Sequence, residues 1–352
     1  MPGARTLAFL LLVAASTHAS AAVRVRIAVL GLFHPNQLVV EVSPSSPMLV
    51  DSGQQQLIAG VGTPQRIAVR RASGNVIVQT AGSQIVGERL TFGARSGGES
   101  EFVLVVPRKL RRRYRGNLTI TAGKGELIAV IEMELETAVA SVLAAELSPD
   151  APLEALKAQA VVSRSFLVSG GPRHPYADFC DTTHCQFLRE PPAPASRAAL
   201  AVHATRGLVL AWKGKPFAAM YSASCGGRTH SLAQVGGQVI DYPYFSVACA
   251  YCRRVPEKWS SRVSKTDAAA LVPDSEEERV KTGRRLGWNT LPSNTFTKSD
   301  AADAVVLNGV GRGHGVGLCQ RGAAGLARDG MDFRAILAYY FPNTTVESVA
   351  SP

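Results

Sequence analysis

Apolar and polar side chains alternate along most of the first third of the chain. Between Val23 and about Val130, short runs such as RVRIAVLGL, QLVVEV, RIAVRR and FVLVV are separated by Gly, Pro, Ser and Asn. A period of two places successive side chains on opposite faces of a strand, and the separating residues are typical of turns. The pattern therefore predicts a β-rich N-terminal region.

The pattern changes after ELIAVIEMELETAVASVLAAEL, where Ala, Leu and Glu replace the β-branched residues. The following segment, to about Val168, predicts a helix with Pro152 in its first turn and Asp150 as its cap. The apolar positions of this helix are spread around its axis, so we expect it to be buried on more than one side.

The rest of the chain mixes helices and strands. RGLVLAWKGKPFAAMYSAS predicts a hairpin that turns at Lys213–Lys215, and DSEEERVKTGRR predicts a surface helix. The tail predicts a glycine-rich loop, a helix interrupted at Gly330, a second helix and a closing strand. The fold class is therefore α+β, with a β-rich N-terminal region followed by a mixed α/β core.

The first residues, MPGARTLAFLLLVAASTHASAA, combine a basic residue, a short apolar run and small residues spaced for signal peptidase. This arrangement predicts a secretory signal over residues 1–21, because the apolar run is shorter than the roughly 18 to 20 residues that cross a bilayer. We expect no integral membrane segment after cleavage, and a periplasmic or cell-envelope location. Export would place six cysteines where free thiols oxidise.

The net charge of +11 indicates an anionic partner. For an exported protein, a lipid surface or the acidic polymers of a cell wall suit this charge better than nucleic acid. The densest basic cluster, RKLRRRYRG over residues 108–116, lacks the interleaved aromatic residues of a single-strand binder. We therefore expect a solvated basic edge there and no nucleic-acid partner.

HPYADFCDTTHCQF contains four side chains of the types that bind zinc: His174, Cys180, His184 and Cys185. The spacing alone leaves a zinc site and a Cys180–Cys185 disulfide equally open. A cysteine nucleophile with a histidine base is a third interpretation, which needs partners close in space.

The other four cysteines are Cys225, the CAYC pair Cys249 and Cys252, and Cys319. Two structural disulfides are favoured over a second metal site, because export implies an oxidising compartment.

Glu146 has apolar neighbours along the sequence, AAEL, just before the predicted helix. A carboxyl group in apolar surroundings keeps its proton to higher pH and can act as a general acid, although most Glu residues before helices are solvated. In GRGHGVGLCQRGA, the glycines would let His314 and Gln320 approach a ligand, unless the segment is only a tight turn.

Four segments taken together are more specific than any one of them: ELSPDAPLEALKAQAVVSRSFLV, DFCDTTHCQ, AAMYSASCGGRTH and GRGHGVGLCQRGAAGLARDGMDFRAILAYYFPNTTV. In this order they resemble the SpoIID/LytB family, named after the stage II sporulation protein D and an amidase enhancer. The resemblance runs from about Tyr114 to Val346. It implies a catalytic domain over residues 114–348, after a β-rich region over residues 22–113.

The resemblance implies a lytic transglycosylase that cleaves peptidoglycan glycan strands, with a preference for strands already stripped of stem peptides. The family's catalytic acid falls on Glu146, although its E-M-P motif is E-L-S-P here. The positions of family zinc ligands fall on His174, Cys180, His184 and Cys185, so the implied cofactor is a structural zinc ion. A single acid is sufficient for this reaction, whereas a two-carboxylate hydrolase needs a partner that the motifs do not supply.

The same motifs suggest polar side chains that would contact sugar hydroxyl and acetamido groups. The expected substrate-binding residues are Gln159, Arg164, Tyr221, Ser224, His314 and Gln320. The main alternative is a non-catalytic wall-binding protein that recruits or enhances an N-acetylmuramoyl-L-alanine amidase. A peptidase that uses Cys180 or Cys185 is the third hypothesis.

Overall fold

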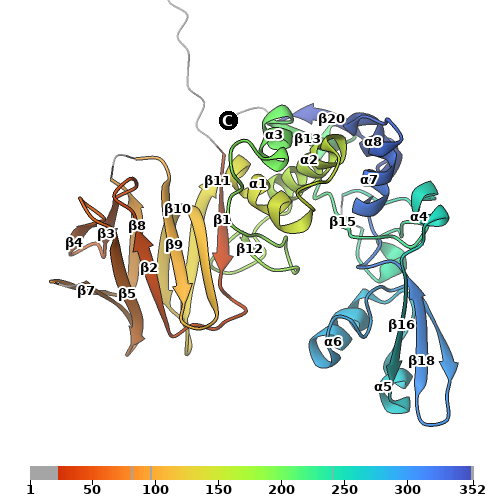
Figure 1. Cartoon of the computed structure of the whole chain (residues 1–352), viewed down its shortest axis with the longest axis horizontal. Coiled ribbons are helices and arrows are strands. Elements are labelled where there is room, and N and C mark those ends of the chain that lie inside the picture. The colour runs from red at the N-terminus through yellow and green to blue at the C-terminus, as the bar shows by residue number, and fades with distance from the viewer. Residues whose placement is uncertain (1–22, 81, 96, 240, 350–352) are drawn as a thin grey trace, which may run out of the picture.

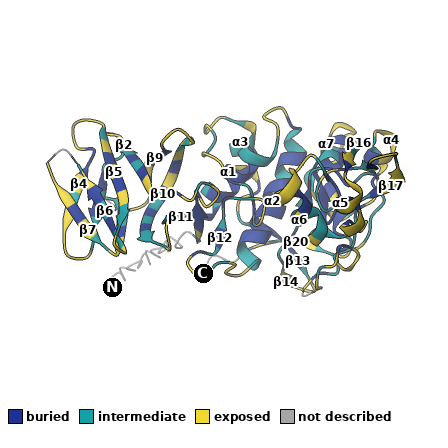
Figure 2. Ribbon diagram, turned by 90° about the horizontal axis from the view of Figure 1, so that it is seen from below, coloured by how far each residue is buried: buried dark blue, intermediate teal, exposed yellow. Residues whose placement is uncertain are grey.

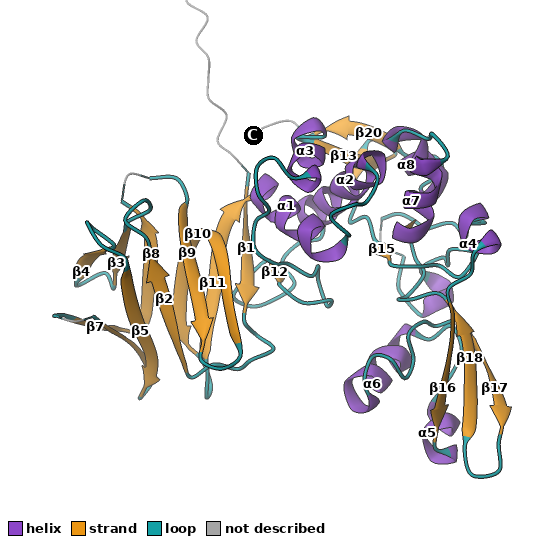
Figure 3. Ribbon diagram, in the orientation of Figure 1, coloured by secondary structure: helices purple, strands orange, loops and turns teal. Residues whose placement is uncertain are grey.

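The computed structural model describes residues 23–80, 82–95, 97–239 and 241–349, so the predicted secretory signal over residues 1–21 lies outside the described residues. A β-rich region, a helical middle and a projecting arm follow one another along the longest axis (Figure 1). The arm, as named here, consists of β16–β18 with α5 and α6. The architecture confirms the α+β prediction, with a large β-rich N-terminal region before mixed helices and strands (Figure 3).

The β-rich region forms because every second side chain of its strands is apolar and buried, as in the pattern BeBiBiB of β9. Figure 2 shows this alternation of buried and exposed residues along the strands. Its strands are β1 (Arg24–Val29), β2 (Gln37–Val42), β3 (Met48–Asp51), β4 (Gln56–Ala59), β5 (Gln65–Ala72), β6 (Asn75–Gln79), β7 (Gln84–Gly87), β8 (Arg89–Ala94), β9 (Ser100–Val106), β10 (Leu110–Ala122) and β11 (Leu127–Glu134).

Strand β10 joins the two halves of the sheet. Residues 110–116 pair with β9, and residues 117–122 pair with β11 and β8. The change of partner falls at Gly116, which has φ of 144°, and a Cβ atom there would lie 2.6 Å from the Glu132 carbonyl oxygen. Only glycine fits this corner. The predicted division between residues 113 and 114 falls inside β10, so separate domains stay a prediction.

The helical middle is built around α2 (Leu153–Ser169), which is buried on two sides. Its residues Leu156 and Ala160 belong to the core of the β-rich region, while Ala158 and Val161 belong to a second core with α7 and α8. This confirms the expected burial on more than one side. Capping by Asp150 is wrong, because Pro152 is the N-cap residue, one position before the first turn, and no side chain makes a capping hydrogen bond.

Four of the remaining helices pack against α2, one packs against α7, and α5 and α6 belong to the arm (Figure 1). These remaining helices are α1 (Leu135–Glu146), α3 (Arg197–Ala204), α4 (Ala250–Arg254), α5 (Lys265–Ala270), α6 (Glu276–Leu286), α7 (Gln320–Arg328) and α8 (Phe333–Tyr340), with a 3-10 turn over Ala233–Val235. The predicted interruption at Gly330 is confirmed, since it lies between α7 and α8 with φ of 92°. Within the residues that the structure describes, no helix is long and apolar enough to cross a membrane.

Short strands connect these helices. They are β12 (Phe179–Cys180), β13 (Leu208–Trp212), β14 (Lys215–Pro216), β15 (Tyr221–Ser222), β16 (Lys258–Val263), β17 (Phe296–Asp300), β18 (Val305–Val310), β19 (Leu318–Cys319) and β20 (Thr345–Ser348). The hairpin β13–β14 confirms the predicted turn at Lys213–Lys215, and β20 closes that sheet beside β13. The arm was not predicted as strands, because its sequence is polar and lacks a clear apolar alternation.

The basic segment on β10 is only partly a solvated edge. Arg111 pairs with Glu41 at 2.8 Å near solvent, as the prediction implies. The side chain of Arg112 points inward, donates to the Leu188 carbonyl oxygen at 3.2 Å and lies 3.6 Å from the buried Asp181 carboxylate. Part of the basic run therefore attaches a loop of the helical middle to the sheet.

Candidate functional site

Three separate segments meet at the side chain of Glu146. Glu146 is the last residue of α1, and its Oε1 atom accepts hydrogen bonds from the Tyr221 hydroxyl and the Phe187 backbone N–H, each at 3.1 Å. Tyr221 comes from β15, and Phe187 comes from the loop between α2 and α3. The fold thus holds one carboxyl group at a fixed place between a helix end, a strand and a loop.

Burial raises the pKa of Glu146 above its ordinary value, and this effect exceeds the opposing effects of Tyr221, the Phe187 N–H and the charge of Arg189. The position at the C-terminal end of α1 acts in the same direction as burial, because the helix dipole disfavours negative charge there. Burial also raises the pKa of Tyr221 well above its ordinary value, so its hydroxyl keeps its proton. The site holds a carboxyl group whose proton is available closer to neutral pH.

His174, Cys180, His184 and Cys185, the His/Cys cluster, bring their ligand atoms within 4.8 Å of one another. The Cys185 sulfur lies 3.4 Å from His174 Nε2 and 3.5 Å from His184 Nδ1, and the Cys180 sulfur lies 3.9 Å from His184 Nδ1. Around one tetrahedral zinc ion, the usual bond lengths separate nitrogen and sulfur ligands by about 3.5 Å. The residues present therefore fit the ion that the family resemblance implies.

The loop that carries the His/Cys cluster is anchored to the β-rich region. β12 lies parallel to β1, and the Asp181 N–H donates to the Ala28 carbonyl oxygen at 3.0 Å. The Asp181 carboxylate accepts from the Leu30 N–H at 3.3 Å, and burial raises the pKa of Asp181 to about 6. Since Phe187 follows Cys185 by two residues, the geometry of this cluster bears directly on the Phe187 N–H that contacts Glu146.

All six cysteines lie among the described residues, and all six are free. The expectation of two disulfides among Cys225, Cys249, Cys252 and Cys319 is therefore wrong for this structure. The Cys252 and Cys319 sulfurs lie 3.6 Å apart, too far for the S–S bond of about 2.05 Å.

Gln159 and Gln320 meet in a buried chain of hydrogen bonds. The Gln320 amide donates to Gln159 Oε1 at 3.3 Å, and the Gln159 amide donates to the Ser163 hydroxyl at 3.0 Å. The Gln186 amide donates to the Ser163 carbonyl oxygen at 3.2 Å, directly before Phe187 in the sequence. This series of hydrogen bonds joins α7, α2 and the loop beside Glu146, so we propose that both glutamines position these segments.

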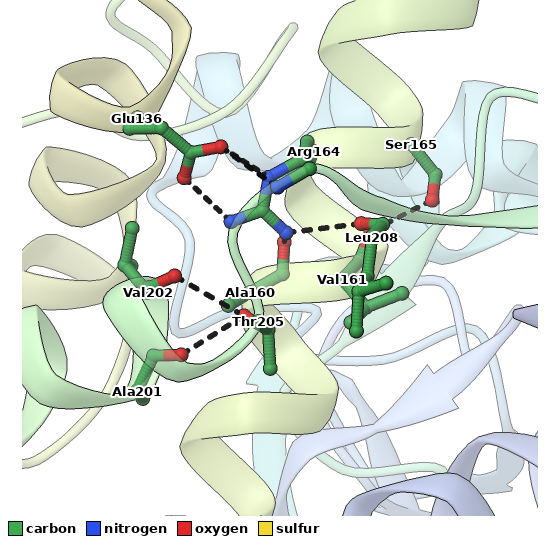
Figure 4. A network of polar contacts seen from close by, with 10 residues as sticks. Glu136, Ala160, Val161, Arg164, Ser165, Ala201, Val202, Thr205 and Leu208 are labelled. Atoms are coloured by element: carbon green, nitrogen blue, oxygen red, sulfur yellow. Dashed lines mark hydrogen bonds and ion pairs between the residues drawn. The ribbon is translucent and has the colours of Figure 1, made fainter. Parts of the chain in front are cut away.

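Arg164 belongs to a network of polar contacts with Glu136 and Leu208 (Figure 4). Its side chain is fully buried, pairs with both carboxylate oxygens of Glu136 at 3.0 and 2.6 Å, and donates to the Leu208 carbonyl oxygen at 3.0 Å. These contacts occupy the guanidinium group and leave it no exposed surface. We therefore propose a structural role for Arg164 in place of the expected contact with substrate.

Of the two other expected substrate-binding residues, His314 lies beside the Tyr221 backbone, and Ser224 lies beside Cys252. Ser224 is buried, with its hydroxyl 3.9 Å from the Cys252 sulfur. His314 accepts from the Val316 N–H at 3.0 Å, and burial lowers its pKa to about 4, so the imidazole is neutral at pH 7. Within the described part of the chain, no hydrogen bond joins either side chain to Glu146.

The sequence predicted no role for Phe187, Ser163 or Gln186. Gln186 and Phe187 are the last two residues of HPYADFCDTTHCQF, so their place in this cysteine-containing motif was the available signal. Ser163 lies one turn after Gln159 on α2, on the same face, which the helical spacing could have indicated. Phe187 acts through its backbone N–H, which no side-chain motif reveals.

The fold and site define an α+β protein with a partly buried carboxyl group at a helix end, beside a loop able to hold a metal ion. The family model "Stage II sporulation protein" matches residues 123–212, which include Glu146 and the His/Cys cluster. An uncharacterized protein of Brachyspira hyodysenteriae is 31% identical over 261 residues, 65% of this chain and 70% of that protein. The chain belongs to the SpoIID family.

Two further relatives have descriptive names. The stage II sporulation protein D of Bacillus subtilis is 22% identical over 268 residues, 62% of this chain and 76% of that protein. The amidase enhancer of Bacillus subtilis is 24% identical over 275 residues, 56% of this chain but only 38% of the enhancer. Together with the family membership, these similarities support a cell-wall-related role.

Proposed function

We propose that this protein is an exported lytic transglycosylase that cleaves the bonds between MurNAc and GlcNAc in peptidoglycan strands. The observation that carries the proposal is the pair of hydrogen bonds that fix Glu146, a carboxyl group whose pKa is raised by burial. Its two hydrogen-bond donors are a hydroxyl and a backbone N–H, so it has no carboxylate partner within hydrogen-bonding distance among the described residues. A two-carboxylate hydrolase would need a second carboxyl group about 5 to 9.5 Å away, and the family motifs supply none for Glu146, which supports a one-acid mechanism.

In the proposed reaction, Glu146 first acts as an acid. Its proton passes to the glycosidic oxygen, the bond from that oxygen to C1 of MurNAc breaks, and the GlcNAc 4-hydroxyl leaves. The substrate's own N-acetyl group supports the positive charge at C1. The Glu146 carboxylate then takes the proton of the MurNAc 6-hydroxyl, whose oxygen bonds to C1 and gives 1,6-anhydroMurNAc. Glu146 ends protonated and no water is consumed.

The other residues have supporting roles in this proposal. Tyr221 and the Phe187 N–H orient the Glu146 carboxyl group, and Gln159 and Gln320 hold the surrounding segments. A structural zinc ion bound by the His/Cys cluster would fix the loop that ends at Phe187. The excess of basic residues supports attraction to an anionic wall polymer.

The experiment that tests the function is product analysis. The full chain is incubated with peptidoglycan sacculi that an amidase has stripped of stem peptides, and the soluble products are examined by mass spectrometry. We expect fragments that end in 1,6-anhydroMurNAc, lighter by one water than the hydrolysis products. Reducing MurNAc ends would instead indicate a hydrolase and contradict the proposed mechanism.

The similarity to an amidase enhancer favours one alternative, a protein that binds the wall and stimulates an N-acetylmuramoyl-L-alanine amidase. The same preparation separates the two functions. Binding to sacculi and faster peptide release by added amidase, with no glycan product from the chain alone, would support the alternative. Peptide release by the chain alone, blocked by thiol alkylation, would instead support a cysteine peptidase.

Replacing Tyr221 with Phe is expected to move the pH dependence of the reaction. The Tyr221 hydroxyl stabilises the ionised Glu146, so its loss should raise the pKa of Glu146 further. Because the protonated acid is the active form, the fall of kcat/KM with rising pH should begin at higher pH in the variant. The measurement is kcat/KM for glycan cleavage across the pH range.

A suitable control is Tyr242→Phe, which removes a buried hydroxyl that donates to the Pro342 carbonyl oxygen at 3.0 Å. In this control, the fall of kcat/KM with rising pH should begin at the same pH as in the wild type. If Tyr221→Phe lowers the rate but does not shift the pH at which kcat/KM falls, the hydroxyl does not control the proton of Glu146.

A further inference from the structure

The second group of cysteines is formed by Cys225, Cys249, Cys252 and Cys319, which we name the four-cysteine cluster. Cys225 follows β15, Cys249 is the N-cap residue of α4 and Cys252 lies within it, and Cys319 ends β19 at the start of α7. Their sulfur atoms all lie within 4.8 Å of one another, and each residue is at most 5% exposed. Three segments that are far apart in the sequence therefore direct four thiols at one buried point.

The distances fit a single metal ion. Four sulfurs at the usual Zn–S bond length of 2.3 Å, in a tetrahedron, lie about 3.8 Å from one another. The Cys252 and Cys319 sulfurs lie 3.6 Å apart. In an iron–sulfur cluster, the cysteine sulfurs surround several iron atoms and must lie farther apart than around one ion. Free cysteines are often ordinary apolar core residues, but core packing alone does not require four sulfurs to share one centre.

The surroundings of the cluster suit thiolates. The N–H groups of Cys225 and Gly322 each point at the Cys319 sulfur, at 3.3 Å. The Tyr340 hydroxyl lies 3.2 Å from the Cys249 sulfur. Donors of this kind orient metal ligands and stabilise their negative charge. A positive ion at the centre would offset the repulsion among four thiolates, and the three donors suit that charged state.

Gly322 shows that the backbone is shaped around the cluster. A Cβ atom at this position would lie 2.0 Å from the Tyr340 hydroxyl and 2.6 Å from the Cys249 sulfur. Glycine is therefore required for the first turn of α7 to approach the sulfurs closely. The close approach places the Gly322 N–H against Cys319, as described above.

We propose that the four-cysteine cluster binds one zinc ion, in addition to the ion of the His/Cys cluster. The ion would link the start of α4, the start of α7 and the loop after β15. β15 and β19 pair in parallel, with Tyr221 opposite Leu318 and Ser222 opposite Cys319. A zinc ion would therefore stabilise the strand that carries Tyr221 and the helix that begins with Gln320, without taking part in the chemistry.

The test is a count of bound metal in the full chain and in a variant without the His/Cys cluster. We expect two zinc ions per wild-type chain and one per chain in Cys180→Ser/Cys185→Ser, by elemental analysis after growth with added zinc. Cobalt in that variant should give the visible absorption of a tetrahedral thiolate site. This result does not depend on glycan cleavage, so it stands or fails separately from the proposed function.

Intact mass and thiol counting under denaturing, non-reducing conditions give the contrary outcomes. Folded Cys180→Ser/Cys185→Ser with no zinc would overturn the proposal. So would a mass lower by four hydrogen atoms, which would show two disulfides among the remaining cysteines. The variant Cys252→Ser should retain only the zinc ion of the His/Cys cluster. If that variant does not fold, the other measurements decide the question.

Discussion

Replacing Glu146 with Gln is expected to lower the rate of 1,6-anhydroMurNAc formation by at least about 100-fold, since general acid and base catalysis each contribute about that much or more. The Gln amide keeps the size of the side chain and can accept the same hydrogen bonds from Tyr221 and Phe187. It cannot give a proton to the leaving oxygen. The measurement is the rate of product release from amidase-treated sacculi, with binding to the sacculi measured in parallel.

The same variant should be more stable than the wild type at neutral and basic pH. The pKa of Glu146 is raised from the ordinary 4.5, so the folded state keeps this proton to higher pH than the unfolded state does. Stability from this group is therefore full at acidic pH and is lost as pH rises through the raised pKa. A Gln side chain does not ionise, so the variant does not lose stability as pH rises. Thermal unfolding should show equal stability of the two proteins at acidic pH. As pH rises through the raised pKa, the variant should become increasingly more stable than the wild type.

Glu190→Gln is the matched control, because its side chain lies in a neighbouring loop but is 58% exposed. It should change neither the rate nor the pH dependence of stability. Wild-type activity in Glu146→Gln would overturn the catalytic assignment. Lost activity together with lower stability at every pH would instead show that Glu146 supports the fold and leave the acid unidentified.

The sequence predicted local structure better than it predicted contacts between distant segments. Alternating apolar residues predicted β2, β5 and β9, because the period of two is a local property. The change of strand partners at Gly116 depends on where the Glu132 backbone lies, which no local pattern specifies. The fold class was therefore predictable, while the strand order was not.

The same distinction applies to the candidate site, where local features were predictable and contacts between distant segments were not. The apolar neighbours of Glu146 and the motif around it pointed to this carboxyl group from the sequence alone. Cys319 lies far along the chain from Cys225, and only the fold brings their sulfurs together. The expected oxidising compartment favoured disulfides for these cysteines, but the fold places their four sulfurs around one point. Such a convergence cannot be deduced from residue types and spacing.

Arg164 shows how residue type alone can mislead. An arginine on a helix within a family motif suggested a contact with substrate. In the structure its guanidinium group pairs with Glu136 and has no exposed surface. The Glu136–Arg164 pair joins α1, which ends at Glu146, to α2 and to the start of β13. We therefore expect its effect on activity to come through the stability of the helical middle.

Replacing Arg164 with Met should destabilise the protein by about 3 to 5 kcal/mol, because it leaves the Glu136 carboxylate without its partner in a largely buried place. The only other hydrogen bond to that carboxylate comes from the Gly207 N–H, at 3.2 Å, among the described residues. The measurement is the free energy of unfolding in urea. The double variant Glu136→Leu/Arg164→Met should regain much of the loss, since removing both charges removes the unpaired one.

The matched control is Arg262→Met, which breaks an ion pair with Asp303 whose side chains are 58% and 80% exposed. It should cost less than about 1 kcal/mol, because water solvates both charges after the pair is broken. Equal losses for Arg164→Met and Arg262→Met would contradict a structural role for the buried pair. If Arg164→Met keeps its stability but loses affinity for sacculi, Arg164 contacts substrate after all, in a conformation that differs from the one described.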